Sequence, residues 1–193
     1  MQSRFAKITA LLLIGSFALG AGRPAPNQPP PTTPHQAEPA PEEAERESLR
    51  GIVGVEVLVD PLDSDIEQAG LSTDKLQEDI RQRIHKAGVK VLTERERLAN
   101  PAAAVLIVRV DTLHDRIGRY FYSADLLLTQ RVKLQTRAET EVSAVTWKKL
   151  GTVSTVADDN VKHLEDQVLR KVDQFIKDYL AVNSDRKVTG GGG

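Results

Sequence analysis

Apolar and polar residues alternate with a period of two along residues 119–137, RYFYSADLLLTQRVKLQTR. Successive side chains of a β-strand point to opposite faces of a sheet, so this alternation predicts a long strand with one buried face and one wet face. A straight strand of about 18 residues would extend about 60 Å at ~3.3 Å per residue, which is too long for a small domain. We therefore expect a bend or a β-bulge within it.

Three further segments predict strands that could pair with this one. Residues 51–59 place valines on one face, and β-branched residues favour strands. Residues 102–113 are almost continuously apolar, which indicates a central strand that is covered on at least one face. Residues 141–156 predict a last strand, interrupted at Gly151. A turn at residues 114–118 connects the second of these segments to the long strand, and this order favours antiparallel pairing.

Two segments predict helices. Residues 71–87 carry an apolar stripe at helical spacing, and Ser72 stands at the position typical of an N-cap. Residues 158–182 carry a wider stripe, and the polar residues 158–160 are expected to cap its start. Such stripes need a sheet to cover them. The sequence therefore predicts an α+β domain: one mostly antiparallel sheet of four to five strands, with two helices packed on one face.

The two ends of the chain differ in composition from its middle. Residues 1–22 have a basic start, an apolar run and small residues after it, which is typical of a cleaved signal peptide; an uncleaved anchor is the alternative. Residues 23–48 are rich in proline and glutamate, so we expect a disordered tether. The α+β domain is expected at residues 49–183, and a disordered, glycine-ended tail at residues 184–193.

Charge and cysteine content narrow the classes of function. The 26 basic and 27 acidic residues give a formal net charge of −1, so no excess of positive charge indicates binding of nucleic acid. The chain has no cysteine, which excludes disulfides, thiolate metal sites and the cysteine-linked anchor of bacterial lipoproteins. We expect an exported, periplasmic or secreted protein without a membrane span after signal cleavage.

Candidate catalytic residues are few. His114 and Asp115 lie together at the end of a predicted strand, where a histidine beside a carboxylate could transfer a proton; ordinary turn residues are the alternative. None of the four histidines has a partner at metal-ligand spacing. Nucleophile elbows, Ser-x-x-Lys and glycine-rich phosphate loops are missing from the sequence. We predict no metal, no cofactor and no enzymatic activity.

An aromatic residue and two arginines form a candidate contact patch. Phe121 falls on the wet face of the long strand, and Arg116 and Arg119 come from the turn before it. Exposed aromatic and arginine side chains are frequent anchors of interfaces, so we expect this patch to contact a partner protein or a glycan. The alternative is that Phe121 packs under the loop at residues 61–70.

Four segments of the predicted domain are familiar in combination: QAGLS at residues 68–72, RYFYSADLLLTQRV at 119–132, VTW at 145–147 and VDQFIKDYLAVN at 172–183. Together they resemble a family of small exported bacterial proteins without an assigned function. The matching positions belong mostly to the core, and none of them is catalytic. The order of elements is also similar to that of small periplasmic accessory domains that assist transport or outer-membrane assembly, which is an analogy of layout only.

These observations leave three hypotheses of function. The first is a non-enzymatic, exported interaction domain that binds another cell-envelope protein through a sheet edge or the Arg119–Phe121 turn. The second is a carrier that holds a small apolar ligand between helices and sheet. The third is a hydrolase that uses His114 and Asp115. A pocket with perturbed titratable groups would favour an enzyme over a binding module.

Overall fold

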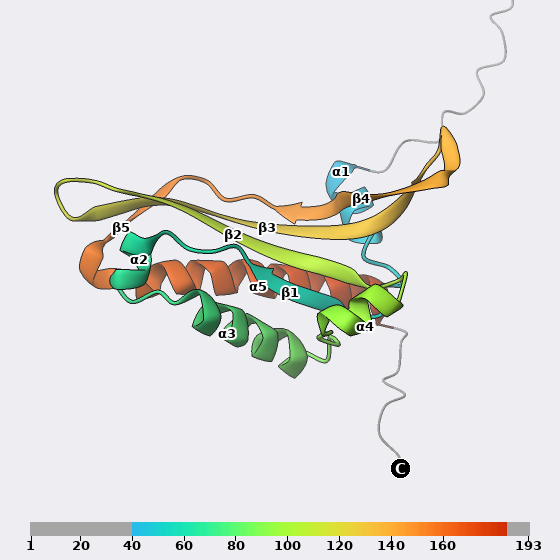
Figure 1. Cartoon of the computed structure of the whole chain (residues 1–193), viewed down its shortest axis with the longest axis horizontal. Helices are drawn as coiled ribbons and strands as arrows, with labels where there is room; N and C mark the ends of the chain where they lie inside the picture. Colours follow the sequence, from blue (N-terminus) through green and yellow to red (C-terminus); the bar gives the residue numbers. More distant parts are fainter. Residues whose placement is uncertain (1–39, 185–193) are drawn as a thin grey trace, which may run out of the picture. The chain divides into compact units, whose positions relative to one another are not determined.

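A computed structural model of the chain describes residues 40–184. The predicted signal peptide, most of the predicted tether and nearly all of the predicted tail lie outside the described residues. The described part has a mixed α+β fold with one open five-stranded sheet and five α-helices (Figure 1). The predicted fold class is confirmed at this level.

The strands and helices of the described part differ widely in length. The strands are β1 (Val55–Val59), β2 (Ala104–His114), β3 (Arg119–Leu134), β4 (Arg137–Lys149) and β5 (Ser154–Ala157). The helices are α1 (Pro41–Glu47), α2 (Ser64–Gln68), α3 (Thr73–Lys86), α4 (Glu94–Ala99) and α5 (Lys162–Asn183), and a 3₁₀ turn (Asp158–Asn160) precedes α5.

The sheet has the order β1-β2-β3-β4, and β5 pairs with the start of β3. β1 and β2 are parallel, and the other pairs are antiparallel, as predicted. β4 and β5 therefore occupy the same edge of β3, one after the other. The expected bulge is present as a shift of register between Leu128 and Thr129, but the extra residue, Thr146, belongs to β4 and not to the long strand.

The interruption predicted at Gly151 is confirmed, and the structure shows its cause. A Cβ atom on Gly151 would lie 2.6 Å from the carbonyl oxygen of Ala124 and 2.7 Å from its nitrogen. Only glycine allows the chain to pass so close to β3. The N–H of Gly151 donates to Oδ1 of Asp125 at 2.6 Å, so this side chain replaces a ladder hydrogen bond at the break.

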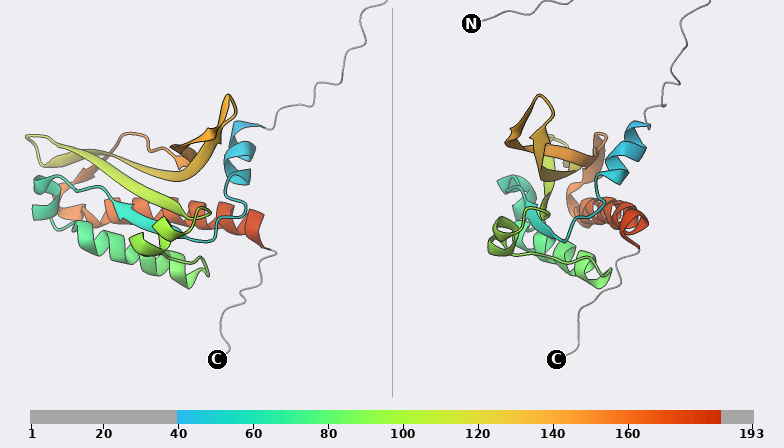
Figure 2. Two further views of the ribbon diagram at one scale, coloured as in Figure 1. Left: turned by 45° about the vertical axis from the view of Figure 1, so that its right-hand side comes forward. Right: turned by 90° about the vertical axis from the view of Figure 1, so that its right-hand side faces the viewer.

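One face of the sheet is buried. Alternate residues of β3, from Tyr120 to Leu128, are buried, and the residues between them are partly exposed, as the period of two predicts. The helix α3 contacts β1 and α5, and α5 contacts β3 (Figure 2). Phe175 of α5 is fully buried and packs edge-to-face with Trp147, with ring centroids 5.4 Å apart, so this tryptophan is a core residue.

The prediction of a disordered tether over residues 23–48 was wrong for its last residues, because residues 41–47 form the helix α1. Proline at the first turn and two glutamates after it suit a helix start. Tertiary contacts then hold this short helix: the hydroxyl of Ser48 donates to the carbonyl oxygen of Thr146, and Arg46 lies 3.6 Å from Asp178. Proline- and glutamate-rich composition alone gives no sign of such contacts.

Candidate functional site

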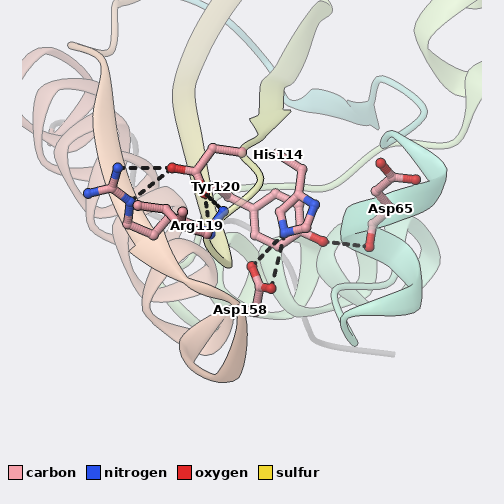
Figure 3. Close-up of polar contacts among 7 residues, drawn as sticks. Asp65, His114, Arg119, Tyr120 and Asp158 are labelled. Atoms are coloured by element: carbon pink, nitrogen blue, oxygen red, sulfur yellow. Dashed lines mark hydrogen bonds and ion pairs between the residues drawn. The ribbon is translucent and has the colours of Figure 1, made fainter.

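Three elements meet at the end of the β2–β3 hairpin: the turn at residues 115–118, the helix α2, and the 3₁₀ turn that begins at Asp158 (Figure 3). The pairing of β5 with the start of β3 brings them together, because Arg119 stands opposite Ala157. The N–H of Asp158 donates to the carbonyl oxygen of Gly118 at 3.2 Å. Gly118 has a φ of 80°, which glycine adopts without strain.

His114 contacts Asp158, not Asp115. Its Nε2 lies 2.9 and 3.0 Å from the two carboxylate oxygens of Asp158. A carboxylate that accepts from Nε2 keeps a proton on that nitrogen and orients the ring. The pairing of His114 with Asp115 was therefore wrong. The expectation that one of residues 158–160 caps the start of α5 was also wrong, since the N-cap is Val161 and no side chain of the described residues caps this end.

Asp115 organises the turn. Its carboxylate accepts from the N–H groups of Ile117 and Arg119, at 2.9 and 3.0 Å, and from the Arg119 guanidinium. Partial burial raises the pKa of Asp115, but these donors outweigh that effect and hold the pKa below its usual value. Asp115 is therefore a turn residue, which was the alternative that the sequence left open.

Tyr120 links the hairpin to α2. Its side chain is only 4% exposed, and its ring stacks on His114 with centroids 4.5 Å apart. The phenol donates to the carbonyl oxygen of Asp65 at 2.9 Å. Burial raises the pKa of Tyr120, and the negative charges of Asp158 and Asp65 raise it further. The phenol thus stays protonated and holds α2 in place.

Two hollows share the His114–Tyr120 stack as a wall. One has a volume of about 300 Å³ and is lined by Asp63, Ser64, Asp65, Thr112, Leu113, His114 and Tyr120. The other has a volume of about 390 Å³ and is lined by Asp65, Gln68, Ala69, His114, Tyr120 and Asp158. Carboxylates border both hollows, whereas no lysine or arginine among the described residues lines either of them. The surface is therefore negative and suits a cationic group.

The predicted contact patch is only partly assembled. The Arg119 guanidinium lies over the Phe121 ring at 5.6 Å and pairs with Asp115 at 2.9 Å, whereas Arg116 is exposed in the same turn. Phe121 is half-buried and stands opposite Leu113 in the sheet. The alternative was that Phe121 packs under the loop at residues 61–70. The residue that contacts this loop is instead Tyr120, whose side chain lies on the other face of the sheet.

Sequence patterns missed four residues of this site: Asp65, Tyr120, Asp158 and Leu113. Tyr120 has the position of an ordinary core residue, and both aspartates have the positions of helix-start charges. Leu113 is 69% exposed, and Ile117 in the adjacent turn is 74% exposed. An apolar residue at the end of a strand gives no sequence signal of exposure, because exposure depends on what the fold places beside it.

The site has an oriented histidine that could accept a proton, but the serine hydroxyl that lines the same hollow is not bonded to that histidine. Asp158 orients His114, and the hydroxyl of Ser64 lines one of the hollows that His114 also lines. That hydroxyl is directed toward Asp65 at 3.4 Å, however, so the structure does not show a nucleophile bonded to the histidine. Within residues 40–184, no cluster of three or more acidic, histidine or cysteine side chains could hold a metal ion.

None of the helices in the described range is long and apolar enough to cross a membrane. Comparison with known proteins found no match to the sequence among protein-family models, curated proteins or solved structures. The resemblance to small exported bacterial proteins therefore stays a prediction, and the function has to be argued from the geometry of this chain.

Proposed function

We propose that the protein is a non-enzymatic, exported interaction domain of the cell envelope, which binds a basic segment of another protein at the end of its β2–β3 hairpin. Export rests on the signal-like residues 1–22 and on the resemblance noted above. The binding role rests on one observation: the two hollows beside the His114–Tyr120 stack are bordered by the carboxylates of Asp63, Asp65 and Asp158.

The contacts of these carboxylates favour a cationic ligand. Asp63 accepts from the Thr112 hydroxyl at 2.7 Å, and Asp158 is engaged by His114. Among the described residues, the Asp65 carboxylate has only a long contact with Ser64, so its charge is the most available to a guanidinium or an ammonium group. Exposed Leu113 would add apolar contact.

A rigid scaffold behind the site supports this proposal over the carrier hypothesis. We infer that α3 and α5 form one layer on the buried face of the sheet. Large side chains fill that layer, among them Phe175, Leu126 and Trp147. A filled layer leaves little room for an apolar ligand, whereas it holds the hairpin end in one geometry for a protein partner.

Peptide binding tests the charge of the proposed ligand. We expect an oligo-arginine peptide to bind the purified protein, and an oligo-glutamate peptide of equal length not to bind. Asp65→Asn should weaken binding roughly tenfold to hundredfold, since a charged hydrogen bond is worth roughly 1.5–3 kcal/mol. Asp74→Asn removes the same charge from an exposed position on α3 and serves as the control. Equal losses in both variants would show that only overall charge matters.

Photocrosslinking in the native cell tests the partner directly. A probe at Leu113 should yield a discrete protein adduct, and a probe at exposed Lys177 of α5 should not. The adduct should decrease when Asp65→Asn is combined with the probe. No adduct from Leu113, or the same adduct from both positions, would contradict the proposed interface.

A hydrolase is the second candidate, because Asp158 holds the His114 ring in one orientation at the edge of a hollow. In this hypothesis the carboxylate partner of His114 is Asp158 instead of Asp115. A screen of ester, amide and phosphate substrates with wild type, His114→Ala and Asp158→Asn tests it. Turnover that both substitutions abolish would favour the enzyme over the interaction domain.

A further inference from the structure

The two outer edges of the sheet differ in how they are covered. At β1, the backbone of Val55 pairs with Lys90 and Leu92, and the side chain of Gln77 accepts from the N–H of Val59. At β4, the hydroxyl of Ser48 covers the carbonyl oxygen of Thr146. Uncovered strand edges are templates for pairing with another chain, so natural folds normally protect them.

Within residues 40–184, residues 141–145 of β4 form a regular stretch without such a cover. They pair in register with Thr129–Lys133 of β3, and within the described residues β3 is the backbone pairing partner of β4. Two valines of this stretch are exposed: Val142 by 36% and Val145 by 49%. The hairpin here extends away from α3 and α5 (Figure 2), and a two-stranded ribbon alone is only marginally stable in water.

The stretch is complementary to itself. In an antiparallel register centred on Ser143, Val142 stands beside Ala144 of the other copy, and Glu141 stands beside Val145 of the other copy. Each of these contacts occurs twice because the pairing is symmetric. A register centred on Glu141 would place two like charges opposite each other, which is unfavourable. A register centred on Ser143 avoids this repulsion and places Val145 beside Glu141 of the other copy.

We propose that two copies of this chain pair antiparallel through residues 141–145 of β4 and join their sheets into one continuous sheet. A two-fold axis at Ser143, perpendicular to the sheet, keeps the helices of both copies on the same face. The pairing satisfies the free backbone groups of the edge and covers Val142 and Val145. It lies at the opposite end of β3 from the hairpin turn, so it is independent of the proposed binding function.

Single cysteines test the register, because the chain has no cysteine of its own. In the proposed dimer the two copies of Ser143→Cys face each other at about 4.5–5.5 Å between Cα atoms, within disulfide range. We expect the purified full chain with this substitution to form a disulfide-linked dimer under mild oxidation. Glu141→Cys is the matched control, since its two copies would lie about 14 Å apart. Equal linkage of both variants, or linkage of neither, would overturn the proposal.

Sedimentation velocity across protein concentration tests the association without a covalent bond. Wild type should change from monomer to dimer as concentration rises. Val145→Lys faces Glu141 of the other copy and should dimerise roughly tenfold more tightly than Val145→Glu, which faces it with a like charge. Val145 is exposed, so both variants should keep wild-type circular dichroism. A monomer at every concentration, or equal association of the two variants, would rule the pairing out.

Discussion

Substitution of Gly151 by alanine should destabilise the domain strongly. The added Cβ would lie 2.6 Å from the carbonyl oxygen of Ala124, which is roughly 1 Å closer than an ordinary contact of about 3.5 Å. The obstacle is the backbone of β3, which β2 pairs with at Ala124 and which β4 and β5 pair with on either side of this point, so Gly151 itself has to move. Overpacking of this kind costs about 1–3 kcal/mol.

Movement of Gly151 would also weaken its 2.6 Å hydrogen bond to Asp125. Hydrogen bonds to charged groups contribute roughly 1.5–3 kcal/mol, and Asp125 is partly exposed, so the lower end applies. We expect a total loss of about 2–4 kcal/mol. For a domain of this size, that loss corresponds to a decrease of roughly 5–15 °C in Tm.

Urea unfolding followed by tryptophan fluorescence measures this effect, because Trp147 is the single tryptophan and is 2% exposed. Thr152→Ala is the control: it changes the next, exposed residue and should stay within about 0.5 kcal/mol of wild type. If Gly151→Ala also stays within that range, the close approach of this segment to β3 is incorrect. The position of Asp158 beside His114 would then lose its support, since β5 follows this crossing.

Three further substitutions test the core and the hairpin. Phe175→Ala should cost about 3–5 kcal/mol in urea unfolding, because this side chain is fully buried against Trp147; a loss below about 1 kcal/mol would contradict that packing. Tyr120→Phe should cost about 0.5–1.5 kcal/mol and speed hydrogen exchange in α2, which its hydroxyl holds through Asp65; unchanged exchange would argue against the bond. Asp115→Asn should lower Tm at neutral pH. Because the pKa of Asp115 is lowered in the folded state, its stabilisation is present above its ordinary pKa and is lost as pH falls through the lowered value, so the Tm difference from wild type should vanish in acid.

Local patterns predicted the long elements well. The alternation along residues 119–134 predicted β3 and its buried face, and the side chain of Ser72 accepts from the N–H of Lys75 as an N-cap should. The turn predicted at residues 114–118 is present, and Gly118 in it has a positive φ. These features depend on residues close in sequence, so their physical causes are visible in the sequence itself.

The sequence could not show which residues meet across the fold. His114 and Asp158 are 44 positions apart, and they meet only because β5 returns to the start of β3. The neighbour in sequence, Asp115, was the plausible partner, yet the backbone N–H groups of its own turn and Arg119 occupy its carboxylate. A hydrogen bond needs a few ångströms in space and has no preference for nearness along the chain.

The sequence by itself determined the α+β class, the long strand with its buried face, and the two long helices, because periodicity and capping act over a few residues. Tertiary structure alone decided the rest. It turned residues 41–47 into a helix, moved the bulge into β4, and gathered Asp65, Tyr120 and Asp158 around His114. Each of these outcomes depends on contacts between segments that are far apart in the chain, and a local pattern carries no information about them.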